Sequence, residues 1–207
     1  MSFLRSRVEE AARIVREGGV IIYPTDTVYG IGCNPFDEAA VQRVVNLKRR
    51  ERKPHPVLAA SLEDLGRVCH LSEKELYLGY ILWPGPVTIV AEKRDDVPEI
   101  VTFGEPTVGV RIPADLTVLE IMRLSGTPLL GTSANISGMP PAASPDAIPD
   151  ELKRGVDMVV DTGATRYGRP STVIRLRGGD IEVVREGAVS LQELKARLSS
   201  TPYKILE

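Results

Sequence analysis

The stretch GGVIIYPTDTVYGIG, residues 18–32, decides the fold that we predict for this chain. Residues 20–23 form an apolar, β-prone run bounded by a glycine pair and by Pro24, a pattern typical of a buried strand. A polar loop follows this strand and ends at Gly30 and Gly32. Because open α/β sheets bind ligands beyond the carboxyl ends of their strands, we expect a ligand site beside this loop.

Four polar side chains of the loop are candidates for one wall of that site: Thr25, Asp26, Thr27 and Tyr29. Threonine and aspartate also satisfy backbone groups in ordinary turns. The loop alone therefore leaves two interpretations open, a ligand site and a well-formed turn.

Length and composition favour one globular domain. The chain has 207 residues, of which 43% are hydrophobic and 26% are charged. A net charge of −2 argues against a protein whose whole surface binds nucleic acid. No apolar run approaches the ~20 residues that a membrane span needs, and the first ten residues lack the apolar core of a signal peptide. We therefore expect a cytoplasmic protein without membrane association.

The cysteines and histidines show no metal-ligand spacing. Cys33 and Cys69 form no CxxC pair, and His55 and His70 fall outside the HExxH and HxxxH patterns. We expect reduced cysteines and no metal site built by protein side chains alone.

The rest of the chain alternates between amphipathic segments and short apolar runs, which predicts an α/β protein. We expect helices at residues 7–17, 37–48, 62–68, 73–82, 116–125 and 191–198. We expect strands at residues 20–23, 57–60, 87–92, 107–113, 158–161, 171–175 and 181–185. The capping boxes that mark helix starts are Ser6 with Glu9, Ser72 with Glu75, and Ser190 with Glu193. Gly178-Gly179 is the expected turn of a C-terminal hairpin, and Trp83 is expected to pack in the core.

Lys48 opens a basic cluster at the end of the second expected helix. It falls on the same helix face as Val41, so its ammonium is aimed either along the core edge or into a cleft. The segment KRRERK, residues 48–53, carries five basic side chains in six positions. Such a run is often a solvated surface, but beside a strand it could also hold an anionic ligand.

Two further features could bind anions. Arg111 stands near the end of the expected strand 107–113, where it could clamp a carboxylate or phosphate, although a lone arginine is often a surface residue. The segment GTSANISG, residues 131–138, could offer hydroxyl, amide and backbone donors to a phosphate, or form an ordinary polar turn. It lacks the spacing of a Walker or Rossmann nucleotide loop.

Several motifs in this order resemble the YrdC-like family. They are PTDTVYGIG, Lys48-x-Arg50, WPGPVT, VGVRIP, Thr132-Ser133-Ala134-Asn135, Ser171-Thr172-Val173 and Arg185-Glu186-Gly187. The resemblance covers about residues 8–190 and departs from the family in Glu51, where proline is common, and in residues 57–61, which lack a frequent histidine. It implies an α/β fold with a twisted mixed sheet, flanking helices and a concave, positively charged cleft. Residues 1–190 would be the catalytic domain, and residues 191–207 a helix and tail.

The resemblance also implies an activity. The family makes L-threonylcarbamoyladenylate and pyrophosphate from L-threonine, bicarbonate or CO2, and ATP, with Mg²⁺ carried by the ATP phosphates. The product serves threonylcarbamoyl modification of tRNA, so a threonylcarbamoyl transferase and tRNA are expected partners, with direct RNA contact open.

The implied site residues follow from the motifs. The family signature assigns the catalytic residues to Lys48, Arg50, Ser133 and Asn135. ATP would be bound by these four residues with Thr132 and Arg185. L-Threonine would be bound by Thr25, Thr27, Tyr29, Arg111 and Ser171. We expect the two cations to face the Ser133–Asn135 turn across a gap that holds the ligands.

Two other functions remain open at this point. A basic concave face could bind double-stranded RNA by phosphate contacts, in which case binding should weaken steeply with salt. The family likeness also allows carbamoyl transfer from carbamoyl phosphate, although larger relatives with that activity carry additional domains.

Overall fold

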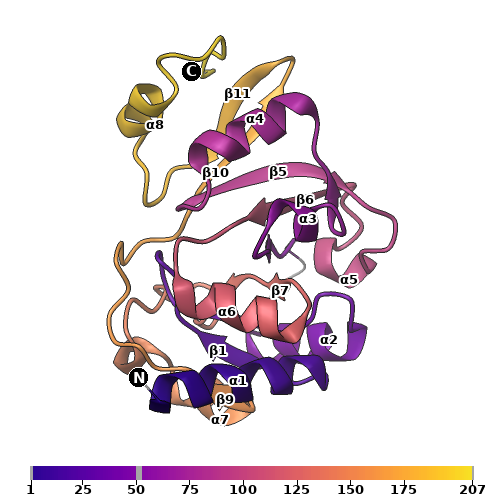
Figure 1. Cartoon of the computed structure of the whole chain (residues 1–207), viewed down its shortest axis with the longest axis vertical. Helices are drawn as coiled ribbons and strands as arrows, with labels where there is room; N and C mark the ends of the chain where they lie inside the picture. Colours follow the sequence, from indigo (N-terminus) through magenta and orange to yellow (C-terminus); the bar gives the residue numbers. More distant parts are fainter. Residues whose placement is uncertain (1, 50–52, 207) are drawn as a thin grey trace.

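The computed structural model describes residues 2–49 and 53–206, whose strands form two sheets (Figure 1). The smaller sheet has the order β8-β2-β1-β9. Its strands are β1 (Ile21–Tyr23), β2 (Gly30–Gly32), β8 (Thr132–Ser133) and β9 (Met158–Val159). β1, the strand expected from residues 20–23, pairs antiparallel with β2 and parallel with β9.

The larger sheet has the order β11-β10-β5-β6-β3-β7, with β4 paired to β5. Its strands are β3 (Val57–Leu58), β4 (Cys69–His70), β5 (Val87–Lys93), β6 (Thr107–Arg111), β7 (Leu129–Leu130), β10 (Thr172–Arg177) and β11 (Asp180–Arg185). β10 pairs parallel with β5, and β3 pairs parallel with β6, whereas β5 and β6 are antiparallel. The predicted mixed α/β class is confirmed, but the strands are divided between two sheets instead of forming one.

Helices flank both sheets (Figure 1). They are α1 (Ser2–Arg16), α2 (Glu38–Leu47), α3 (Leu62–Leu65), α4 (Glu73–Leu82), α5 (Glu99–Thr102), α6 (Leu116–Ser125), α7 (Asp150–Gly155) and α8 (Leu191–Arg197), with a 3-10 turn η1 at Pro145–Ala147. α1 packs beside α6 and against β1, and α4 packs against β5. None of the described helices combines the length and apolar character needed to cross a membrane.

Local signals placed most helix starts correctly. Asp37 caps α2 by accepting a hydrogen bond from Ala40 N at 3.0 Å. The capping boxes at Ser72 and Ser190 are both formed. The predicted box at Ser6 is wrong, because α1 already begins at Ser2 and places Ser6 inside the helix. Residues 3–5 contain neither glycine nor proline, so nothing in them stops the helix from extending.

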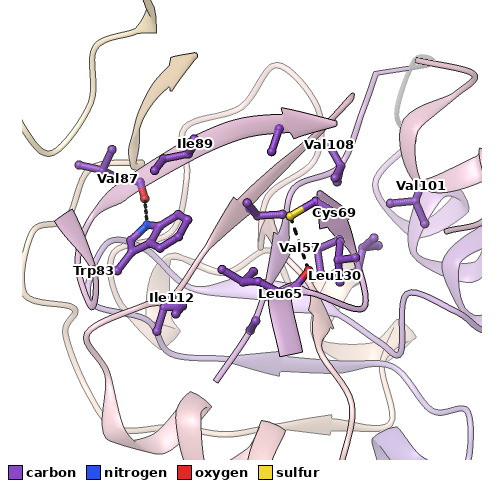
Figure 2. Packing of buried hydrophobic residues seen from close by; sticks show 14 of the residues in the cluster. Val57, Leu65, Cys69, Trp83, Val87, Ile89, Val101, Val108, Ile112 and Leu130 are labelled. Atoms are coloured by element: carbon purple, nitrogen blue, oxygen red, sulfur yellow. Dashed lines mark hydrogen bonds between the residues drawn. The ribbon is translucent and has the colours of Figure 1, made fainter. Parts of the chain in front are cut away.

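Buried apolar side chains form two clusters, one on each side of β1. Ile22 belongs to a large cluster that also contains residues of the larger sheet. Ile21 and Tyr23 point the opposite way, into a cluster with α1 and α6. Figure 2 shows part of the large cluster, in which Trp83 packs as expected and its Nε1 donates to Val87 O at 2.7 Å. A strand covered on both faces explains the uninterrupted apolar run at residues 20–23.

The chain passes between the two sheets at Gly131, which lies between β7 and β8. Gly131 N donates to Pro56 O at 2.7 Å, and Leu130 N donates to Cys33 O at 2.9 Å. A Cβ at Gly32 would lie 1.9 Å from Leu130 O, so only glycine permits this close approach. The crossing sets Ser133 opposite Gly30 in the smaller sheet. This pairing brings the loop before β2 close to the turn that follows β8.

Candidate active site

A cavity of about 360 Å³ lies where the two sheets meet, within the size range of small-molecule sites. Most residues that the sequence predicts for the site line it: Thr25, Thr27, Tyr29, Arg111, Thr132, Ser133, Ser171 and Arg185. Lys48 and Asn135 are not among the described lining residues, and Arg50 lies outside the described part of the chain. The positive charge expected of this cleft stays a prediction.

The loop between β1 and β2 is held by its own hydroxyl groups. Thr25 Oγ1 donates to Val28 O at 2.7 Å and accepts from Thr27 N at 3.1 Å and from Val28 N at 3.2 Å. Thr25 thus builds the turn and also lines the cavity, so the turn interpretation is confirmed, and a ligand site beside this loop stays a prediction.

Arg111 has a partner that the sequence did not reveal. Its guanidinium forms an ion pair with the Asp26 carboxylate and donates to Thr27 Oγ1 and to Gly85 O, each at 2.8 Å. The Arg111 side chain is only 4% exposed. Burial lowers the pKa of Arg111, and the negative charge of Asp26 opposes that effect. The predicted carboxylate clamp therefore already holds a carboxylate of the protein.

Lys48 is buried and directly contacts the turn that it was expected to face across a gap. Its Nζ donates to Ser133 O, to Asn135 O at 2.8 Å and to Asn135 Oδ1 at 3.4 Å. Its carbonyl oxygen accepts from Ser137 N at 3.1 Å. The expected proximity of Lys48 and Asn135 is present, but the expected gap between them is wrong. Ser133 lines the cavity, whereas Lys48 is not among its described lining residues.

The Asn135 side chain forms further hydrogen bonds within this turn. Its Oδ1 accepts a hydrogen bond from Ser133 Oγ, and its Nδ2 donates to Ile136 O and Met139 O. The side-chain amide of Asn135 thereby shapes the loop that presents Ser133 to the cavity.

The motifs Ser171-Thr172-Val173 and Arg185-Glu186-Gly187 contact each other beside the cavity. The Thr172 hydroxyl donates to Val189 O and accepts from Gly187 N at 3.0 Å. Arg185 Nη2 donates to Ser171 O at 2.8 Å. Two motifs that are separated in the sequence therefore hold each other in place.

Residues 161–170 cross the loop that carries the threonines. The Tyr29 hydroxyl donates to Gly163 O at 2.8 Å, and Thr165 Oγ1 donates to Thr27 O at 2.9 Å. Tyr167 N donates to Asp26 O at 3.0 Å. The Tyr29 ring is fully buried at the cavity wall. That it packs over a ligand stays a prediction.

Sequence reasoning missed two buried polar residues of the wall, Thr88 and His55. Thr88 Oγ1 lies 2.8 Å from Ser171 Oγ, and its position inside WPGPVT was an available signal. The His55 ring packs 5.8 Å from the Phe103 ring, and its place between two prolines carried no signal of its own. Within the described residues, no group of three or more His, Cys, Asp or Glu side chains is arranged to hold a metal ion.

Comparisons with known proteins find relatives that align with most of the chain. The Sua5/YciO/YrdC family model, described as "Telomere recombination", matches residues 13–187. A threonylcarbamoyl-AMP synthase of Pyrococcus abyssi is 37% identical over 199 residues, covering 93% of this chain and 58% of that protein. A putative threonylcarbamoyl-AMP synthase of Methanocaldococcus jannaschii is 35% identical, covering 87% of this chain and 85% of that protein. The chain thus spans a little over half of its Pyrococcus relative.

Solved structures show the same fold. P. abyssi Sua5, determined in complex with L-threonine, has a TM-score of 0.89 and 35% identity, covering 96% of this chain and 58% of that chain. E. coli YciO has a TM-score of 0.78 and 28% identity, covering 89% of this chain and 90% of that chain.

Proposed function

The chain belongs to the Sua5/YrdC family, and on this premise we propose that it is an L-threonylcarbamoyladenylate synthase. It would join L-threonine, bicarbonate or CO2, and ATP, and release pyrophosphate. The observation that carries the proposal is the cavity where the PTDTVYG loop, Ser133 and Ser171 meet. Support also comes from the relatives named as synthases and from the neighbour solved with L-threonine.

The reaction makes one bond at phosphorus and breaks another. The threonine amine takes up CO2 to become a carbamate and loses a proton. A carbamate oxygen then attacks the α-phosphorus of ATP, and the bond to the pyrophosphate oxygen breaks. Both reactants are anions and charge develops on the phosphoryl oxygens, so the protein acts mainly by positioning and by electrostatic stabilisation.

The wall residues divide into two proposed groups. We assign L-threonine to the part of the cavity formed by Thr25, Thr27, Tyr29, Arg111 and Ser171. We assign the ATP phosphates to the part formed by Thr132, Ser133 and Arg185, with Arg50 added on the family signature. Lys48 and Asn135 would act by holding Ser133 in place. Mg²⁺ would arrive with ATP, held by phosphates and water.

We also propose downstream partners and a cellular location for this reaction. The product is a reactive mixed anhydride that a second enzyme would transfer to tRNA, so a threonylcarbamoyl transferase and tRNA are the proposed downstream partners. We propose the cytoplasm as the place of this reaction.

Pyrophosphate release tests the proposal. Purified protein with Mg-ATP and bicarbonate should release pyrophosphate only when L-threonine is added, and without any RNA. Release that does not depend on L-threonine, or that requires carbamoyl phosphate in place of bicarbonate, would contradict it. Ser133→Ala should be about 10- to 100-fold slower, the scale of one lost hydrogen-bonding group. Ser137→Ala, in an exposed position of the same loop, is the matched control and should retain the wild-type rate.

A further inference from the structure

A second groove of the protein lies between α1 and α6, which run side by side in Figure 1. Its volume is about 360 Å³. Its lining includes Leu4, Arg5 and Glu9 of α1, and Leu116, Glu120 and Leu124 of α6. The exposed fraction is 42% for Leu4, 85% for Leu116 and 41% for Leu124. Leucine side chains this exposed gain from being covered, so the groove is a candidate contact surface for another molecule.

The charges of this groove restrict the kind of molecule that fits it. On α1, Arg5 Nε donates to Glu9 Oε1 at 3.0 Å. On α6, Arg123 Nη1 donates to Glu120 Oε2 at 2.7 Å. Paired charges of both signs give no net attraction to a polyanion such as nucleic acid or to an anionic membrane. They suit a partner whose own surface alternates the same two signs.

The order of side chains along α6 is self-complementary. Leu116 lies four residues before Glu120, and Leu124 lies four residues after it, so all three share one helix face. The two leucines are about 12 Å apart along the helix axis. If two copies of α6 lie antiparallel across a two-fold axis at Glu120, Leu116 of one protomer meets Leu124 of its partner, and the reverse contact forms at the same time.

The same axis also suits α1. Arg5 and Glu9 lie on either side of position 7, and an axis at that position brings Arg5 of one protomer beside Glu9 of its partner. Both residues line the groove together with Glu120, so one axis serves both helices. The two Glu120 carboxylates would meet near the axis, but each has Arg123 as its own counterion. The group of four charges there is neutral.

The size of the face indicates how strong the contact is. α1 has 15 residues and is about 22 Å long, and two helices side by side are about 20 Å wide. The face therefore offers roughly 400 Å² per protomer, whereas stable interfaces bury about 800 Å² per partner. A contact of this size fits a reversible dimer that forms at high protein concentration, with a dissociation constant in the micromolar range or above.

We propose that the groove between α1 and α6 binds the same groove of a second copy of this chain, which gives a reversible and symmetric homodimer. Leu116 and Leu124 form its apolar contacts, and Arg5 with Glu9 forms ion pairs across the axis. This inference goes beyond the proposed function and does not depend on it.

Sedimentation equilibrium from about 5 to about 500 µM protein tests the proposal. The average mass of the wild type should rise with concentration from that of a monomer toward that of a dimer. Leu116→Glu or Leu124→Glu places a carboxylate in the contact and should raise the dissociation constant at least about tenfold. Tyr80→Glu is the matched control, because Tyr80 is 68% exposed on α4, and it should leave the dissociation constant unchanged.

Cysteine cross-linking tests the register and still decides if a glutamate variant does not fold. A mixture of the Leu116→Cys and Leu124→Cys proteins should form disulfide-linked dimers of the mixed kind on mild oxidation, and Tyr80→Cys should form none. The native cysteines Cys33 and Cys69 are buried and do not compete. A wild type that stays monomeric over the whole range, a dimer that both glutamate variants leave intact, or cross-links only between like variants would each overturn the proposal.

Discussion

At the scale of single residues, Lys48 shows how burial changes the task of a charged side chain. Its exposed fraction is 1%, and its ammonium group is surrounded by oxygen atoms of the Ser133–Asn135 turn. The ammonium is the donor to Asn135 O, whereas Ser133 O also accepts from Asn135 N at 2.9 Å. We therefore attribute to Lys48 the shape of the loop that presents Ser133.

Lys48→Met keeps the length of the side chain and removes the charge. Because Asn135 O then loses its Lys48 donor, we expect the free energy of unfolding to fall by about 1–3 kcal/mol. Amide hydrogen exchange in residues 133–137 should become faster than elsewhere in the protein. Lys153→Met, in a partly exposed i,i+3 pair on α7, is the control and should change stability by less than about 0.5 kcal/mol. Unchanged denaturant midpoint and exchange in Lys48→Met would show that the ammonium is dispensable.

The sequence predicted which residues line the cavity better than what they contact there. Thr25, Thr27, Ser133 and Ser171 were found because they lie in short motifs with local signatures. The pairing of Asp26 with Arg111 was not found, because it joins residues 85 positions apart and no local pattern encodes it.

At the scale of elements, the turn after β11 fixes the positions of Ser171 and Arg185. Gly187 packs against the chain before β10, and a Cβ there would lie 2.3 Å from Pro170 O and 2.5 Å from Ser171 O. Those atoms belong to the backbone, so they cannot move aside as the end of a flexible side chain would. Close packing against these backbone atoms therefore requires glycine at position 187.

Gly187→Ala should destabilise the protein by about 1–3 kcal/mol, the usual cost of overpacking. It should also displace Ser171 and weaken L-threonine binding. The comparison variant is Gly66→Ala at the end of α3, where the new Cβ would lie 3.2 Å from Glu63 O, a milder contact that should cost less stability than Gly187→Ala. Thermal unfolding and calorimetric L-threonine binding measure the two effects. A Gly187→Ala variant with wild-type melting temperature and affinity would be incompatible with this packing.

Helix starts and the hairpin were predictable because each depends on neighbouring residues. The Gly178-Gly179 turn connects β10 and β11 as expected, with φ of 61° and 98°. The start of α1 was not predictable from Ser6 and Glu9, since a capping signal does not reveal whether the preceding residues also join the helix.

At the scale of the whole molecule, the division into two sheets could not be read from the sequence. It depends on the crossing at Gly131 and on pairings between distant strands, such as β1 with β9. The order of motifs predicted the family and the mixed α/β class. The two clusters on either side of β1 emerge only when those long-range pairings are known.

Asp157 links distant parts of the fold and makes stability depend on pH. Its carboxylate accepts from Arg43 at 2.6 and 3.0 Å and from Val20 N at 2.8 Å, which joins α2 to the start of β1. The hydrogen bond from Arg43 is the main cause that lowers the pKa of Asp157 below its ordinary value of 3.8. The unfolded state therefore binds a proton at higher pH than the folded state does.

The stabilisation from Asp157 is fully present above about pH 4 and is lost as pH falls through the lowered pKa. Asp157→Asn should reduce stability near pH 7 by no more than about 1 kcal/mol, because the pair is partly exposed. The difference between variant and wild type should shrink below pH 4. Urea unfolding between pH 3 and 7 measures this, and a difference that stays constant over that range would disprove the linkage.

The most direct test of the whole account is a crystal structure of the protein with L-threonine and a non-hydrolysable ATP analogue. The account predicts L-threonine in the cavity between the two sheets, beside Thr27 and Ser171, with Arg111 still paired with Asp26. It also predicts the triphosphate on the side of Ser133 that faces the cavity. An L-threonine carboxylate bound to Arg111 in place of Asp26, or both ligands bound outside this cavity, would contradict it.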